Sequence, residues 1–262
     1  MKKHIIEILH QIEKEYEVRI LFACEAGSRA WGFPSETSDY DIRFIYVHKP
    51  EWYLSIDKKR DVIEVPKHEK LCIPVHHLID MSGWEITKAL RLLRKSNPSL
   101  LEWLHSNNVY YQIDSITEKV LELSAKTFAP VPCMHHYIRM AKANYKRLRE
   151  TVPSIKGYVN VIRPLFAAKW IEENNEMAPL ELPVIVGKVE MNEDVKLEVT
   201  ELLHKKISGQ DLKDVNLNHL DSHINSELKR LEEYVETLPI KINDPTDLLD
   251  SFFRETLTSI WN

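Results

Sequence analysis

The chain has 262 residues, of which 44% are hydrophobic and 29% charged, a balance that is typical of globular proteins and excludes wholesale disorder. The net charge of -5 at pH 7 excludes a globally basic nucleic-acid binder, while leaving room for a local basic patch. No apolar run approaches the roughly 18 residues of a membrane span, so we expect no membrane partner. The three widely spaced cysteines predict neither a disulfide framework nor a CxxC metal site, and favour a reducing, cytoplasmic setting.

The first part of the chain mixes helix and strand patterns. In chain order these predict a helix over 3–16, strands over 18–24 and 40–47 separated by a loop over 27–38, and two further strands over 61–65 and 73–79. Helical spacing begins at Trp84, and Pro98 separates this helix from a shorter one that ends near His105.

The second part of the chain is helical throughout. Its apolar spacing predicts helices over 114–127, 131–150, 158–174, 190–206, 214–237 and 246–260. Strands followed by a run of helices predict an α+β fold, in which a small mixed sheet precedes a C-terminal helical bundle. We therefore expect two domains, over residues 1–110 and 111–262.

Two aspartates at the start of the second predicted strand are the first candidates for chemistry. Because side chains alternate along a strand, Asp39, Asp41 and Arg43 are expected to share one face. Two carboxylates so placed repel each other unless a cation neutralises them. With no Cys or His ligand nearby, oxygen donors favour a hard ion, Mg²⁺ or Mn²⁺.

A glycine and a serine directly follow the first predicted strand. Gly27 allows a backbone N–H to approach an anion closely, and the Ser28 hydroxyl can donate a further hydrogen bond to a phosphate oxygen. Arg29 adds a permanent charge with forked donors. A turn that grips phosphate, placed beside a carboxylate metal site, is what phosphoryl or nucleotidyl transfer requires.

These motifs resemble a known superfamily. Gly27-Ser28, followed after ten residues by Asp39-Tyr40-Asp41-Ile42, resembles the signature of the DNA polymerase β-like nucleotidyltransferases. The longer Gly-Ser-Arg-Ala-Trp-Gly and Ser-Asp-Tyr-Asp-Ile-Arg strings resemble, more narrowly, a bacterial and phage group associated with RNA ligases in RNA repair. Two later stretches, 83–103 and 158–170, also fit that group.

The resemblance implies roles for individual residues. Gly27 and Ser28 would contact the triphosphate, and Asp39 and Asp41 would bind the metal ions. Arg29 is a further candidate for phosphate binding because of its charge, not because of the resemblance, and an ion pair with Glu25 or Glu36 is its alternative. A third carboxylate would serve as metal ligand and as base for the attacking hydroxyl. Asp80, which follows the predicted 73–79 strand and precedes a helix, is preferred for this role, and Glu64 is the reserve. In this superfamily a helical domain often supplies a lysine to the triphosphate, and Lys142, in a basic stripe with Arg139 and Lys146, is the candidate.

The resemblance also implies an activity. We expect metal-dependent transfer of a nucleoside monophosphate from an NTP such as ATP to a hydroxyl, with release of pyrophosphate. An RNA 3′ end is the favoured acceptor, and proteins of an RNA ligase pathway are the expected partners. Two alternatives stay open: transfer of AMP to a protein hydroxyl, and a non-catalytic nucleotide-binding adaptor in RNA repair.

Overall fold

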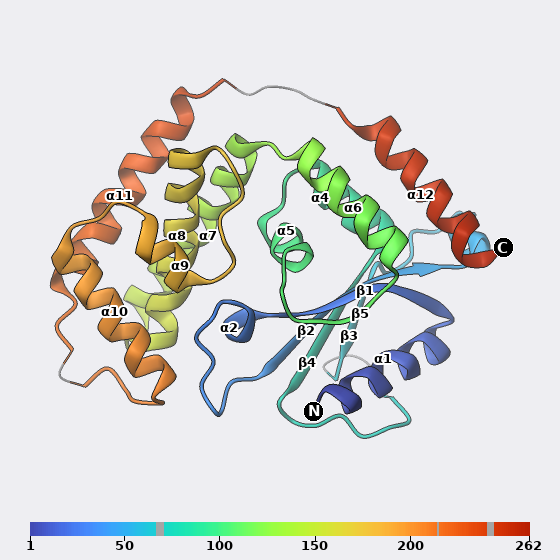
Figure 1. Ribbon diagram of the computed structural model, residues 1–262, viewed down its shortest axis with the longest axis horizontal. Coiled ribbons are helices and arrows are strands. Elements are labelled where there is room, and N and C mark those ends of the chain that lie inside the picture. The colour runs from blue at the N-terminus through green and yellow to red at the C-terminus, as the bar shows by residue number, and fades with distance from the viewer. Residues whose placement is uncertain (67–70, 214, 240–243) are drawn as a thin grey trace. The chain divides into compact units, whose positions relative to one another are not determined.

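The computed structural model describes residues 1–66, 71–213, 215–239 and 244–262 (Figure 1). Contacts divide the chain into two compact units. The first takes the described residues of 1–30, 39–128 and 242–262, and the second those of 31–38 and 129–241. Residues 111–128 and the last helix therefore group with the sheet. The expected split at residue 110 into separate domains stays a prediction.

The first unit contains a five-stranded mixed sheet, in the order β3-β4-β2-β1-β5. Its strands are β1 (Val18–Ala26), β2 (Tyr40–His48), β3 (Val62–Val65), β4 (Ile79–Glu85) and β5 (Val109–Gln112). β2 runs parallel to β4, and the other neighbouring strands are antiparallel. This mixed sheet, together with the helices around it and beyond it, confirms the expected α+β class.

Helices cover both faces of this sheet. The helices of the first unit are α1 (Lys2–Tyr16), α2 (Gly27–Ala30), α3 (Pro50–Tyr53), α4 (Ile86–Arg94), α5 (Pro98–Leu104), α6 (Asp114–Thr127) and α12 (Thr246–Trp261), of which α12 packs against α4. The apolar stripe of α1 shares a buried core with Ile42 and Phe44 of β2. On the other face, Ile45 of β2 meets apolar residues of α4, including Leu90, and Val120 of α6. Both faces of the sheet are thus largely apolar, and charged residues of β2 and β4 are among the exceptions.

The expected fourth strand over 73–79 is wrong, because the strand that pairs with β2 is Ile79–Glu85. Ser82-Gly83 has the composition of a turn but lies in the middle of β4. A Cβ built at Gly83 would lie 2.1 Å from Cε2 of Phe44, so glycine makes room for that ring. β5 was also missed, because its four residues give too short an alternation to detect.

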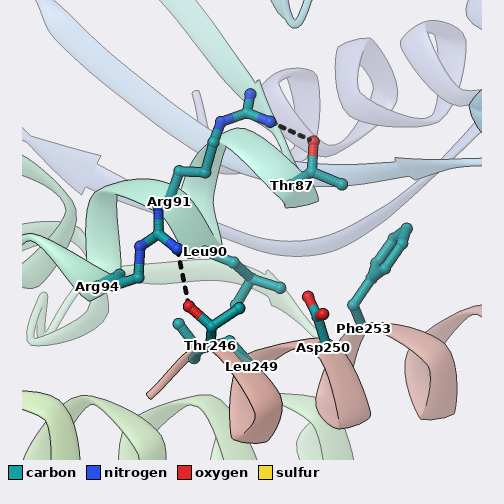
Figure 2. Close-up of a pocket in the computed structure, with 8 residues that line it drawn as sticks. All are labelled: Thr87, Leu90, Arg91, Arg94, Thr246, Leu249, Asp250 and Phe253. Carbon is teal, nitrogen blue, oxygen red and sulfur yellow. Dashed lines mark hydrogen bonds between the residues drawn. The ribbon is translucent and has the colours of Figure 1, made fainter. Parts of the chain in front are cut away.

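An open pocket in the first unit lies between α4 and α12 (Figure 2). It is lined by Thr87, Leu90, Arg91, Arg94, Thr246, Leu249, Asp250 and Phe253. Nη1 of Arg94 donates to Oγ1 of Thr246 at 2.8 Å, and Nη2 of Arg91 pairs with Asp61 at 3.1 Å. These arginines therefore join α4 to its neighbours, and no lining residue belongs to the predicted site.

The secondary structure of the second unit is all helical over its described residues. It contains α7 (Pro130–Glu150), α8 (Ile155–Asn174), α9 (Leu182–Lys188), α10 (Glu193–Ile207) and α11 (Asn218–Thr237). α8 is buried along nearly its whole circumference, which makes it the central helix, with α7, α10 and α11 packed against it. The helices expected from the sequence are confirmed, except that α9 was missed. The expected start at residue 214 lies outside the described residues.

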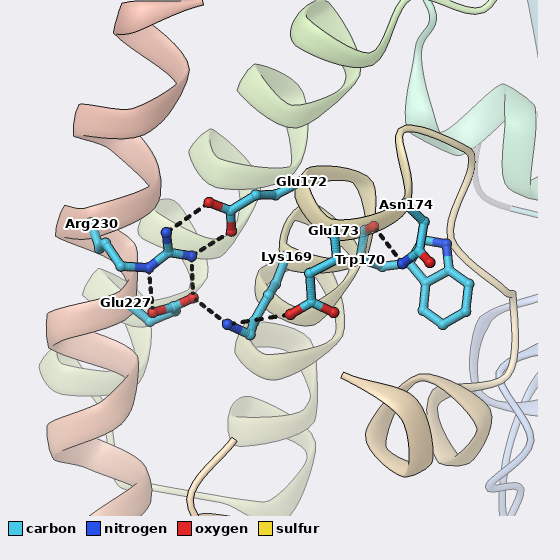
Figure 3. Close-up of polar contacts among 7 residues, drawn as sticks. All are labelled: Lys169, Trp170, Glu172, Glu173, Asn174, Glu227 and Arg230. Atoms are coloured by element: carbon cyan, nitrogen blue, oxygen red, sulfur yellow. Dashed lines mark hydrogen bonds and ion pairs between the residues drawn. The ribbon is translucent and has the colours of Figure 1, made fainter. Parts of the chain in front are cut away.

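Ion pairs bind α11 to α8 at the surface of this unit (Figure 3). Nη1 of Arg230 donates to Oε1 of Glu172 at 2.7 Å, and its Nη2 pairs with Glu227 at the same distance. Lys169 reaches both Glu227, at 3.3 Å, and Glu173, at 3.4 Å. Because the charges alternate along this chain of contacts, the network joins the two helices without leaving a half-buried carboxylate uncompensated.

The loop between the Gly-Ser turn and Asp39 packs with the second unit. The backbone N–H of Leu182 donates to the Trp31 carbonyl at 3.0 Å. The guanidinium of Arg163, which is only 1% exposed, lies 5.9 Å from the Trp31 ring centre and donates through Nε to the Leu180 carbonyl. Within the described chain, no helix has the length and apolar character needed to cross a membrane.

Candidate active site

The Gly-Ser turn lies directly against one of the predicted aspartates. β1 ends at Ala26, which is opposite Asp41 of β2, and the chain turns at Gly27 with φ +60°. A Cβ built at Gly27 would lie 2.1 Å from Oδ2 of Asp41. Only glycine tolerates both the left-handed backbone and this approach. Ser28 follows on the short helix α2, where it is half-buried.

Asp80 lies beside Asp41 on the neighbouring strand. The parallel pairing of β2 with β4 makes the two residues Cα partners, so their side chains leave the same face of the sheet. Asp80 was expected to follow a strand, but it is the second residue of β4 and reaches Asp41 through strand register. Glu64 lies one strand further away, opposite Ser82, and its carboxylate pairs with Arg60 at 3.1 Å.

A single guanidinium joins the two aspartates. Nη2 of Arg43 lies 3.0 Å from Oδ1 of Asp41 and 3.0 Å from Oδ2 of Asp80. Its Nη1 donates to the carbonyls of Ile42, at 3.0 Å, and Asp80, at 3.1 Å. The side chain of Arg43 is 19% exposed, so these contacts lie in a partly dehydrated setting. Arg43 was placed on this face from the sequence but was given no role.

Asp39 and Arg29 lie at the entrance to β2. Asp39 precedes the first residue of the strand and is exposed. Nε of Arg29 donates to the Asp39 carbonyl at 3.1 Å, and the guanidinium lies 3.8 Å from the centre of the Tyr40 ring. Arg29 is therefore held next to the turn and the aspartates by a cation–π contact and a hydrogen bond. Its contact with phosphate stays a prediction.

Glu25 supports the site from the opposite face of the sheet, and no role was predicted for it. The residue is 2% exposed, and burial raises the pKa of its carboxyl. Oε1 accepts from the Asp41 backbone N–H at 2.8 Å, and the Tyr110 hydroxyl donates to Oε2. Its one visible signal in the sequence is a charged residue that directly follows the apolar run 20–24, two positions before Gly27.

Lys142 belongs to the second unit, on α7. Its Nζ pairs there with Glu232 of α11 at 2.7 Å, and the side chain is half exposed. Lys146 of the same stripe pairs with Glu150, and Arg149, further along α7, pairs with Asp221. The role of Lys142 at the triphosphate stays a prediction.

Comparison with known proteins agrees with the motifs. A sequence model of the RNA repair pathway DNA polymerase beta family matches residues 1–255. The chain belongs to this family. Membership confirms the resemblance inferred from Gly27-Ser28 and Asp39-Tyr40-Asp41, and places the chain among polymerase-β-like nucleotidyltransferases.

Two individual proteins are similar to the chain over most of its length. The uncharacterized protein YcgL of Bacillus subtilis is 41% identical over 263 positions, which cover 100% of this chain and 98% of YcgL. A nucleotidyltransferase-like protein of Exiguobacterium sibiricum, known from a crystal structure, is 10% identical. That alignment covers 98% of this chain and 80% of the other, with a TM-score of 0.31.

Proposed function

We propose that the protein is a divalent-metal-dependent nucleotidyltransferase that moves a nucleoside monophosphate from an NTP, such as ATP, to the 3′ hydroxyl of an RNA. The observation that carries the proposal is the register of Asp41 with Asp80, next to the turn at Gly27. The groups that we propose to bind phosphate and cations therefore lie at one end of the sheet, an arrangement that suits phosphoryl transfer.

The residues present suit a hard divalent ion. Among the described residues no group of three or more Asp, Glu, His or Cys side chains is already arranged as a metal site. Asp41 and Asp80 nevertheless hold one cationic group between them, the Arg43 guanidinium. Their oxygen donors, with Asp39 at the strand entrance, would hold Mg²⁺ or Mn²⁺. When bound, such an ion neutralises charge on the phosphates and on the attacking oxygen.

The chain's own groups would position the reactants. Gly27, Ser28 and Arg29 would hold the triphosphate, with Lys142 as a further candidate from the helical unit. The acceptor hydroxyl oxygen would form a bond to the α-phosphorus, while the bond to pyrophosphate breaks and its electron pair leaves with the pyrophosphate. Asp80 would take the hydroxyl proton and return it to solvent.

The family supports the choice of acceptor. Its description places these proteins in an RNA repair pathway, which favours an RNA end. Proteins of an RNA ligase pathway are proposed as partners only from the resemblance of the motifs. Because one fold hosts many acceptors, this part of the proposal needs a direct test.

The acceptor is tested by incubating the purified protein with Mg²⁺, each α-labelled NTP in turn and a set of RNAs with a free 3′ hydroxyl. The same RNAs with a 3′-deoxy end serve as the matched control. We expect label on the hydroxyl-ended RNA only, with one pyrophosphate released for each nucleotide added. Label on a protein band in cell extract would instead identify a protein-modifying enzyme. NTP binding without pyrophosphate release would identify an adaptor.

A further inference from the structure

Arg43 is held by four hydrogen bonds that divide into two sets. Nη2 contacts the carboxylates of Asp41 and Asp80, both at 3.0 Å. Nη1 contacts two backbone carbonyls, those of Ile42 and Asp80, which carry no net charge. The first set depends on the two acidic groups, whereas the second fixes the guanidinium to the sheet itself. The cation is thus built into the strands beside the carboxylates.

The charges explain why a cation stands there. Two adjacent carboxylates on one face of a sheet repel each other, and more strongly where water is partly excluded. The side chains of Asp41 and Asp80 are 29% and 35% exposed. A guanidinium stays protonated at every physiological pH, so it neutralises one of the two charges permanently. One negative charge remains, which is less than the pair would offer to an incoming divalent ion.

We infer that Arg43 is an internal counter-ion that competes with the divalent metal for Asp41 and Asp80, and that Nη2 releases at least one carboxylate when the metal binds. This inference rests on the proposed function. In the metal-free protein Arg43 keeps the carboxylates together on the sheet. When the ion enters, the carbonyl contacts of Nη1 hold the guanidinium nearby. The site therefore stays ordered in both states, and its metal affinity is set below that of the bare carboxylate pair.

The experiment measures Mn²⁺ binding by electron paramagnetic resonance, without NTP, in the wild type and in Arg43→Gln. We expect Arg43→Gln to bind Mn²⁺ on the order of tenfold more tightly, because the competing charge is gone. Its melting temperature should be lower without metal and should rise more than that of the wild type on metal addition. Arg19→Gln, at an exposed position of β1, is the matched control and should bind Mn²⁺ as the wild type does.

Unchanged or weaker Mn²⁺ binding in Arg43→Gln would overturn the inference, since Arg43 would then support the carboxylates rather than compete for them. Should that variant fail to fold, Arg43→Met decides the question, because it also removes the charge and keeps an unbranched side chain of similar length. Mn²⁺ affinity above the wild type supports competition, and affinity at or below it contradicts competition. Nucleotide transfer is assayed separately. If the Arg43 variant binds Mn²⁺ more tightly but the wild type transfers no nucleotide, only the proposed function is contradicted. If the wild type transfers nucleotide but the variant does not bind Mn²⁺ more tightly, only the role of Arg43 is contradicted.

Discussion

The carboxylate of Asp41 occupies the space that a side chain at Gly27 would need, because a Cβ built on the glycine would lie 2.1 Å from Oδ2 of the aspartate. The backbone of the turn and the carboxylate are therefore fitted to each other. Gly27 also has φ +60°, where side chains are disfavoured. Any side chain at position 27 has to move either the turn or the carboxylate.

Gly27→Ala tests this fit. We expect the substitution to displace the Asp41 carboxylate and to reduce nucleotide transfer by about a hundredfold or more, because a misplacement of about 1 Å costs that much in a positioned site. Left-handed strain adds a stability loss of roughly 1–2 kcal/mol. Gly187→Ala is the control, since nothing lies within 4 Å of a Cβ at that position in α9. Wild-type activity in both variants would contradict the fit.

Gly83→Ala tests the packing of β4 on β2. The added methyl would lie 2.1 Å from the Phe44 ring, so we expect a loss of roughly 1–3 kcal/mol in urea unfolding. Phe44→Leu in the same chain removes the two nearest clashing atoms, Cε2 and Cζ, and should restore part of the loss. If the two substitutions prove additive, the ring and the glycine are not in conflict as the structure shows.

The parts of the candidate site that lie close together in the sequence could be predicted from it, whereas a distant part could not be placed correctly. The turn and the first aspartates lie within 15 residues, and their order and spacing between two apolar strands, with the family resemblance, predicted that they would form one site. Asp80 joins them through the register of a parallel pair, which depends on a strand whose paired residues lie 39 positions further along the chain. The pattern placed that strand too early, because Gly83 resembles a turn unless the Phe44 ring opposite it is known.

Arg43 and Glu25 show a second limit of prediction from the sequence, which is that the partners of a side chain could not be identified. Each was visible as a charged residue in a strand, but its partners come from β4 and β5, which alternation did not locate correctly. Propensity and periodicity indicate which face a side chain takes, and not which neighbour it finds there. The helices of the second unit, which depend on local spacing, were predicted far better.

Glu25 should act as a positioning residue for Asp41. Glu25→Ala leaves the Asp41 N–H and the Tyr110 hydroxyl without their acceptor, so we expect a stability loss of about 2–4 kcal/mol and a marked loss of transfer. Glu25→Gln keeps an oxygen for the N–H and should recover most of the activity. Thermal unfolding and single-turnover rates measure the two effects. Equal losses in both variants would assign the role to the charge instead.

His48 should make the first unit sensitive to acid. Burial lowers its pKa from 6.5 to about 4, while its ring stacks on Trp52 at 4.2 Å. The folded state thus favours the neutral ring, so this stability is complete above pH 6.5 and is lost as pH falls towards 4. Between pH 7 and 4 we expect the wild type to lose roughly 2 kcal/mol more than His48→Phe, allowing for partial exposure.

The matched control is His10→Gln on α1, where the ring is 58% exposed. Urea unfolding at each pH gives the stability of all three proteins. The control should follow the wild-type curve, and an identical pH dependence in His48→Phe would remove His48 as the cause.

The most direct measurement is the single-turnover rate of nucleotide transfer in Asp41→Asn, Asp80→Asn and Glu64→Gln, each checked for wild-type folding by circular dichroism. Asp57→Asn, at an exposed loop position, is the matched control. We predict losses on the order of a thousandfold or more for the two aspartates, and rates within a few-fold of wild type for Glu64→Gln and the control. Folded Asp41→Asn and Asp80→Asn proteins that transfer nucleotide at the wild-type rate would contradict the account.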